Sequence, residues 1–136
     1  MRGYSMEITY EKLIEMAYEA MRFAYTPYSK FNVGAALLAS TGDVYTGCNI
    51  ESASYGATNC AERTALFKAV SEGHRSFKAI AIVSESKLPT YPCGICRQML
   101  MEFGDLDVIL DRGGTLVIHR LSELLPHSFT KTDLLL

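Results

Sequence analysis

The chain is organised around two short sequences, Cys60-Ala61-Glu62-Arg63-Thr64-Ala65 and Pro92-Cys93-Gly94-Ile95-Cys96-Arg97-Gln98. The first carries a thiol and a carboxylate two residues apart, and the second carries two thiols at positions i and i+3. Three thiolates are one ligand short of the closed tetrahedral site of a structural zinc. The pattern therefore indicates an open zinc site, in which water or a substrate takes the fourth position.

Each of these sequences begins a predicted helix that follows a strand and a loop. The first helix is expected over residues 60–71, with Gly73 as its stop, and the second over residues 92–103. Between them, Lys78 to Val83 is an almost unbroken apolar run, which is typical of a strand covered on both faces. We expect both helical connections to join parallel strands.

Upstream, the sequence predicts a helix and a hairpin. Apolar residues recur at three- and four-residue steps from about Thr9 to Tyr25. That helix must end near Tyr25, because Pro27 disfavours helical geometry at the residue before it. Residues 31–39 and 44–49 are then predicted as two antiparallel strands joined by a turn, and an irregular polar loop follows them.

Downstream, residues 107–110 and 115–119 are predicted as strands joined by a tight turn. Ser122 is predicted to cap a short final helix that ends before Pro126. Helices therefore alternate with buried strands along the chain. This order predicts the α/β class: a single three-layer α/β/α domain over residues 1–136, with a five-stranded mixed sheet.

Charge and composition exclude several classes of protein. With 13 basic and 15 acidic residues the net charge is −2, so the chain lacks the cationic surface that a nucleic-acid partner requires. No stretch approaches the length of a membrane span, and residues 1–10 hold no apolar targeting core. We therefore expect a cytoplasmic protein whose four cysteines stay reduced and serve metal binding or catalysis.

The helix starts suit metal binding by thiolates. A helix N-terminus carries partial positive charge, which lowers the pKa of a cysteine placed there. Cys93 and Cys96 lie one turn apart, so both sulfurs can reach one ion, and Cys60 would supply the third ligand. Glu62 could stand beside a zinc-activated water without binding the metal, as a general acid/base requires.

The net negative charge of a zinc ion with three thiolates would be offset by a cation nearby. Zn²⁺ and three thiolates sum to −1, which makes the metal less Lewis-acidic than a site with histidine ligands. Arg63 and Arg97 are the candidates to offset that charge.

Simpler interpretations compete with this one. Glu62 could be only the capping-box partner of Asn59, and a lone C-x-x-C could be a redox pair or half of a zinc ribbon. Cys48 and Cys60 are too far apart to complete a ribbon, and a redox pair leaves the C-x-E element unexplained. Cys48 is interpreted as a small buried residue. Surface or core roles are expected for the histidines outside these motifs, which are His74, His119 and His127.

The C-A-E and P-C-x-x-C elements at 60–62 and 92–96 resemble the signature of the zinc-dependent deaminases. Matching sequence continues through residues 27–36, 47–55 and 124–129, so the likeness covers nearly the whole chain in order. These segments together are similar to the short, homotetrameric cytidine deaminases.

The resemblance implies hydrolytic deamination of cytidine and deoxycytidine to uridine and deoxyuridine, with release of ammonia, in pyrimidine salvage. It implies one Zn²⁺ per subunit, bound by Cys60, Cys93 and Cys96. It also implies that a zinc-activated water attacks the base and that Glu62 shuttles the protons.

The same resemblance implies a nucleoside pocket shared between the subunits of a homotetramer. Asn49 and Glu51 would bind the ribose hydroxyls. The other implied substrate-side residues are Ile50 in the same run, Phe31 against the pyrimidine, the Ala61 backbone at the base edge, and Tyr55 and Phe129 completing the pocket.

Two positions depart from the family pattern, and related activities remain open. Tyr91 stands where a small residue, often serine, is usual, and Ile95 stands where alanine is usual, so either could reshape the zinc-side pocket. The alternatives are a blasticidin-type aminonucleoside-antibiotic deaminase, a polynucleotide-editing deaminase and a non-catalytic zinc-stabilised binding module. The sequences at 31–34 and 49–51 favour cytidine. Net charge, short length and Cys60 in place of histidine disfavour polynucleotide editing.

Overall fold

The computed structural model describes residues 7–135, which form a five-stranded sheet between two layers of helices. The strands follow the order β2-β1-β3-β4-β5 across the sheet. Within the described residues, β3 and β4 are parallel and the other neighbouring strands are antiparallel. The predicted mixed sheet is therefore confirmed. Its strands are β1 (Val33–Ala39), β2 (Val44–Cys48), β3 (Phe77–Ser84), β4 (Asp107–Arg112) and β5 (Thr115–Arg120).

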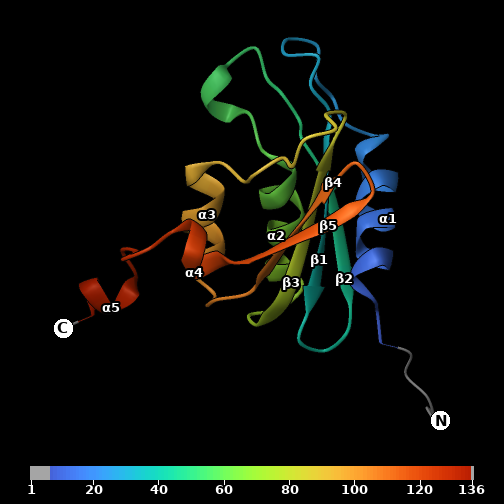
Figure 1. Cartoon of the computed structure of the whole chain (residues 1–136). Helices are drawn as coiled ribbons and strands as arrows, with labels where there is room; N and C mark the ends of the chain where they lie inside the picture. Colours follow the sequence, from blue (N-terminus) through green and yellow to red (C-terminus); the bar gives the residue numbers. More distant parts are fainter. Residues whose placement is uncertain (1–6, 136) are drawn as a thin grey trace.

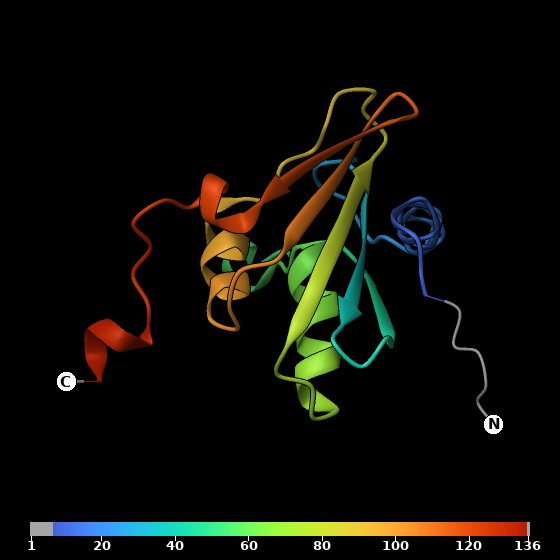
Figure 2. The same cartoon turned by 60° about the horizontal axis from the view of Figure 1, so that its bottom comes forward.

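The helices divide between the two faces of the sheet (Figures 1 and 2). Helix α1 (Tyr10–Met21) covers one face, and α2 (Ala61–Ser71), α3 (Gly94–Met101) and α4 (Leu121–Leu124) cover the other. The predicted three-layer α/β/α fold is thus confirmed. Two short helical segments, η1 (Tyr55–Ala57) and α5 (Lys131–Leu134), lie on segments that project from the sheet.

Side-chain alternation in the central strands supplies both hydrophobic cores. In β1, Ala35, Leu37 and Ala39 pack into the core beneath α2 and α3, whereas Ala36 and Leu38 pack into the core beneath α1. Strand β3 is buried in the same two-sided way. Covering on both faces explains why these strands appear in the sequence as continuous apolar runs.

Two glycines let helices approach the sheet backbone closely. A Cβ atom at Gly47 would lie 2.6 Å from the carbonyl oxygen of Ala61, and a Cβ atom at Gly34 would overlap the carbonyl oxygen of Ala17. Because Ala61 is the first residue of α2, Gly47 sets the beginning of that helix directly against β2. The sheet thereby fixes the position of Cys60.

The first helix is shorter than predicted. It ends at Met21 rather than near Tyr25. The backbone of Tyr25 instead pairs with the segment that follows β2: its amide donates to Asn49 at 3.0 Å, and its carbonyl accepts from the Glu51 amide at 2.9 Å. Pairing with a distant segment outweighs the local helical pattern.

The starts of the other helices also differ from the prediction. The extended backbone of Cys93 makes it the N-cap of α3, so the helix starts at Gly94 rather than at Pro92. Ser122 is not the cap of α4. Arg120 occupies that position, and Ser122 instead donates from its amide and hydroxyl to Asp105 at 2.9 and 2.8 Å.

The predicted absence of a targeting signal concerns residues 1–10, of which residues 1–6 lie outside the described residues. Leu136, the last residue of the predicted domain, also lies outside them. Within residues 7–135, no helix combines the length and apolar character needed to cross a bilayer.

Candidate active site

Three sulfurs meet where α2 and α3 begin. Cys60 is the N-cap of α2, Cys93 is the N-cap of α3, and Cys96 lies in the first turn of α3. Their sulfur atoms lie within 4.8 Å of one another, with 3.7 Å between the Cys60 and Cys93 sulfurs. The structure therefore brings together the three cysteines that the sequence predicted as zinc ligands.

The donor set fits a single zinc ion. Among the described residues, no other His, Cys, Asp or Glu joins these three in a metal-binding group. Three thiolates suit a soft ion such as zinc, which prefers four ligands in a tetrahedral arrangement. One position on the ion would remain open, as in catalytic zinc sites.

The electrostatic surroundings favour a thiolate at Cys60. A hydrogen bond from the neighbouring Cys96 thiol, together with Arg63, holds the pKa of Cys60 well below its usual range. The Arg63 guanidinium donates to the Cys60 sulfur at 3.3 Å. The shared proton and burial raise the pKa of Cys96. One guanidinium thus already compensates part of the negative charge of the sulfur group.

Glu62 is a buried carboxyl in the first turn of α2. Its side chain is 4 % exposed, and burial raises its pKa to about 7. The capping-box interpretation of Glu62 is wrong. The N-cap is Cys60 rather than Asn59, and the Asn59 side chain donates to the Thr64 hydroxyl at 3.1 Å. The carboxyl therefore stands beside the sulfur group without forming the predicted capping box at the start of the helix.

Arg97, the other predicted cation, binds backbone carbonyls. Its Nε donates to the Pro92 carbonyl at 2.7 Å, and its terminal nitrogen donates to the Leu124 carbonyl at 2.7 Å. These bonds tie the segment before α3 to the end of α4. Of the two arginines, Arg63 contacts the Cys60 sulfur, whereas Arg97 binds only the backbone near the sulfur group.

The predicted sugar-binding run lies next to the sulfur group. Ile50 exchanges both backbone hydrogen bonds with Asn59, the residue before Cys60, at 2.9 Å each. The Asn49 side chain accepts from the Val33 amide at 2.9 Å and donates to the Phe31 carbonyl at 2.8 Å. Three predicted substrate-side residues thus share one hydrogen-bonded frame with the residue that precedes Cys60.

Glu51 lies at the edge of a hollow of about 400 Å³, lined also by Tyr28, Ser29, Tyr55 and Thr58. Its carboxylate accepts from the Ser29 hydroxyl and from the amides of Tyr28 and Ser29 at 3.0 and 3.1 Å. These bonds, chiefly the one from the hydroxyl, lower the pKa of Glu51. A carboxylate offers about four acceptor sites, so one remains for a ligand. No local pattern in the sequence indicates that Tyr28 and Ser29 hold this side chain.

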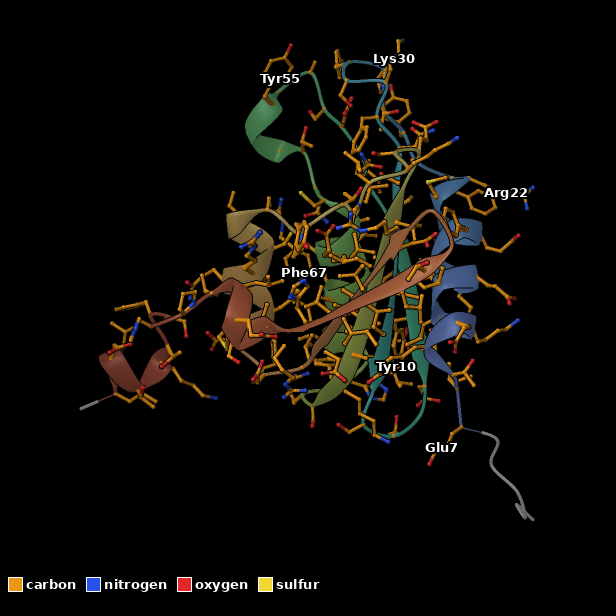
Figure 3. The ribbon with its side chains drawn as sticks, in the orientation of Figure 1. Glu7, Tyr10, Arg22, Lys30, Tyr55 and Phe67 are labelled. Atoms are coloured by element: carbon orange, nitrogen blue, oxygen red, sulfur yellow. The ribbon has the colours of Figure 1, made fainter. Side chains whose placement is uncertain are left out.

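The remaining predicted pocket residues are more dispersed. Tyr55 is 75 % exposed on the η1 loop, which stands out from the sheet (Figure 3), and its ring lies 5.9 Å from that of Tyr28. Phe129 is 57 % exposed, and its carbonyl accepts from Gln98 at 2.7 Å. Ala61 is fully buried at the start of α2.

The two departures from the family pattern occupy different surroundings. Ile95 is exposed in the first turn of α3. The hydroxyl of Tyr91 lies 3.1 Å from Nε2 of His119 on β5. The sequence predicts only a surface or core role for His119, and no local pattern connects these two residues, which are 28 positions apart.

Comparison with known proteins identifies the family. Residues 7–111 match the family model described as the cytidine and deoxycytidylate deaminase zinc-binding region. The chain belongs to this family. The match spans α1 through most of β4 and includes all three cysteines of the sulfur group.

Individual relatives agree with this assignment. A cytidine deaminase from Sporosarcina psychrophila is 54 % identical over 127 residues, which cover 91 % of this chain and 93 % of that protein. The crystal structure of a cytidine deaminase from Burkholderia pseudomallei superposes with a TM-score of 0.85 at 49 % identity, covering 89 % of this chain and 99 % of that one. A blasticidin-S deaminase from Bacillus cereus is 32 % identical over 129 residues, covering 88 % of this chain and 91 % of that protein. The predicted resemblance to the zinc-dependent cytidine deaminases is confirmed.

Replacing one cysteine of the sulfur group should remove the metal. We expect Cys60→Ala to lose nearly all its zinc, because two thiolates and an open position bind the ion poorly. Elemental analysis of purified protein measures this directly. Cys48→Ala is the matched control, since Cys48 lies in β2 outside the sulfur group and should keep one zinc per chain. A fully metallated Cys60→Ala protein would contradict the site.

Proposed function

We propose that the chain is a cytidine deaminase that converts cytidine and deoxycytidine to uridine and deoxyuridine, consuming water and releasing ammonia. We place this activity in pyrimidine salvage in the cytoplasm. The observation that carries the proposal is the open group of three sulfurs with the buried carboxyl of Glu62 beside it. The 54 % identity to a cytidine deaminase, against 32 % to a blasticidin-S deaminase, favours the pyrimidine nucleoside as substrate.

In this proposal Cys60, Cys93 and Cys96 hold one zinc ion per subunit. When bound, zinc supplies Lewis acidity at its open coordination position. The surrounding residues prepare that position: the helix N-termini stabilise thiolates, and Arg63 offsets negative charge at the Cys60 sulfur.

Glu62 is assigned the proton transfers. Its carboxylate takes a proton from the attacking water and delivers it to N3 of the pyrimidine. It then takes the remaining proton from the hydroxyl that the water has left on C4 and delivers it to the amino nitrogen, which leaves as ammonia while the C4 carbonyl forms. The nearly complete burial of Glu62 supports this role, because a raised pKa lets one carboxyl accept and donate protons near neutral pH.

The sugar is assigned to Asn49 and Glu51. Each already holds a neighbouring backbone segment, yet Asn49 keeps one N–H and one lone pair, and Glu51 keeps one acceptor site. These groups can donate to and accept from ribose hydroxyls. Phe31 and Ile50, both exposed, supply apolar surface for the pyrimidine. The edge of the base is assigned to the Ala61 backbone.

A glutamine at position 62 provides the sharpest test of this mechanism. Glu62→Gln keeps the size of the side chain but cannot carry a proton, so we expect zinc to stay bound and turnover to fall by about 10²- to 10⁴-fold. Loss of the cytidine absorbance band and release of ammonia are the measurements.

The same assay should include deoxycytidine, blasticidin and a cytosine-containing oligonucleotide as alternative substrates. The wild-type protein should consume both nucleosides and leave the oligonucleotide intact. An active Glu62→Gln variant, or a zinc-loaded wild-type protein that ignores both nucleosides, would refute the proposal.

We also propose that four copies assemble and share their pockets. This assembly is supported by exposed apolar side chains on the segments that project from the sheet, which are those of Tyr55, Phe129, Leu134 and Leu135. The C-terminal segment with α5 stands away from the sheet (Figure 2). An extended arm with exposed apolar side chains is suited to bury them on another copy.

Shared pockets can be tested by mixing two defective chains. Phe129→Ala and Glu62→Gln should each be poorly active alone. In mixed assemblies, an intact Glu62 from one chain can combine with an intact Phe129 from another, so activity should partly return. Light scattering gives the number of copies. A fully active monomer, or mixtures no better than the separate variants, would count against sharing.

A further inference from the structure

Cys93 is held differently from the other two cysteines of the sulfur group. Cys96 is fully buried and Cys60 is half-buried, whereas Cys93 is exposed. Packing around its own side chain therefore does little to fix the Cys93 sulfur. Its position depends on the backbone of the loop that leads from β3 into α3.

The residue two positions before Cys93 is fastened to the sheet. The Tyr91 hydroxyl lies 3.1 Å from Nε2 of His119, and the two ring centroids are 5.5 Å apart at an interplanar angle of 52°. His119 is two residues from Val117 on β5, so both side chains lie on the same face of the sheet. Val117 packs against the core beneath α2 and α3. Tyr91 is thus attached to the sheet face that carries the sulfur group.

Neighbouring residues of this loop have anchors of their own. The Thr90 hydroxyl is hydrogen-bonded to the Ser84 hydroxyl at the end of β3. The Pro92 carbonyl accepts from Arg97 Nε on α3 at 2.7 Å. Three consecutive residues are therefore attached to three different elements, and the contact to β5 comes from a tyrosine side chain.

We propose that Tyr91 and His119 are positioning residues, whose contact holds Cys93 at the place from which it binds the metal. The inference rests on Cys93 being a zinc ligand, as assigned above. The hydroxyl of Tyr91 is engaged by β5 rather than by the sugar-side residues Asn49 and Glu51. The contact should therefore affect metal retention and turnover rather than binding of the nucleoside.

Tyr91→Phe removes the hydroxyl and keeps the ring, so it tests the contact with little disturbance. A typical net hydrogen bond corresponds to a change of about threefold to tenfold in an equilibrium or rate constant. We expect the Tyr91→Phe variant to release zinc to a chromogenic chelator about threefold to tenfold faster than the wild-type protein does. We also expect kcat for cytidine to fall while KM stays unchanged.

Tyr45→Phe is a closely matched control. The ring of Tyr45 packs on His74 with centroids 5.1 Å apart at 58°, and its hydroxyl donates to Glu72 at 3.2 Å. This second tyrosine–histidine pair loses the same atom on substitution, but its partner Glu72 caps the end of α2 opposite Cys60. Its zinc release and its kcat should match those of the wild-type protein.

Variants at the histidine complete the experiment. His119→Ala should speed zinc release as much as Tyr91→Phe does, and the double variant should add little because both remove one contact. His119→Gln retains a polar group that can bond the tyrosine hydroxyl, so it should restore slower release. Loading with Co²⁺ gives an absorption spectrum that reports the sulfur arrangement, which should change in Tyr91→Phe and not in Tyr45→Phe.

Other outcomes would overturn the proposal. Zinc release at the wild-type rate from Tyr91→Phe, or equal acceleration in Tyr45→Phe, would show that the contact does not hold Cys93. A raised KM with unchanged release would place Tyr91 against the nucleoside instead. If the zinc-loaded protein fails to deaminate cytidine, the proposed function fails, but the release rates still decide the role of this contact.

Discussion

The close approach of three cysteine sulfurs, all within 4.8 Å of one another, is the constraint on which the rest of the structure depends. Three thiolates at this distance repel one another unless positive charge lies nearby. Two helix N-termini and the Arg63 guanidinium supply part of that charge, and a zinc ion would supply the rest when bound. The sheet brings the helix starts together: Gly47 lets α2 begin against β2, and the crossover between parallel β3 and β4 carries α3 alongside α2.

The same helix starts connect the metal side of the pocket to its sugar side. Glu62 enters the site because it follows Cys60 in the first turn of α2. Backbone pairing of Ile50 with Asn59 sets the run 49–51 beside Cys60, and Glu51 in turn holds the loop at Tyr28 and Ser29. A nucleoside bound here would meet the carboxyl of Glu62 and the proposed sugar-binding groups of Asn49 and Glu51.

Local patterns in the sequence predicted the layers of the fold and the grouping of the three cysteines in one metal site. Apolar periodicity and thiol spacing depend on residues close together in the chain, so both are visible without the structure. The errors arose where distant segments compete with local preference. Pairing of Tyr25 with residues 49–51 ends α1 early, and Asp105 draws Ser122 away from a capping role. The Tyr91–His119 contact was missed for the same reason, because only the folded sheet brings β5 beneath the loop before Cys93.

We propose that this chain holds one zinc with three sulfur ligands and an open position beside Glu62. A crystal structure with anomalous scattering measured on both sides of the zinc absorption edge tests it most directly. We expect one peak per chain, about 2.3 Å from the sulfurs of Cys60, Cys93 and Cys96, with a non-protein atom as the fourth ligand. A peak elsewhere, or a fourth side chain closing the site, would contradict it.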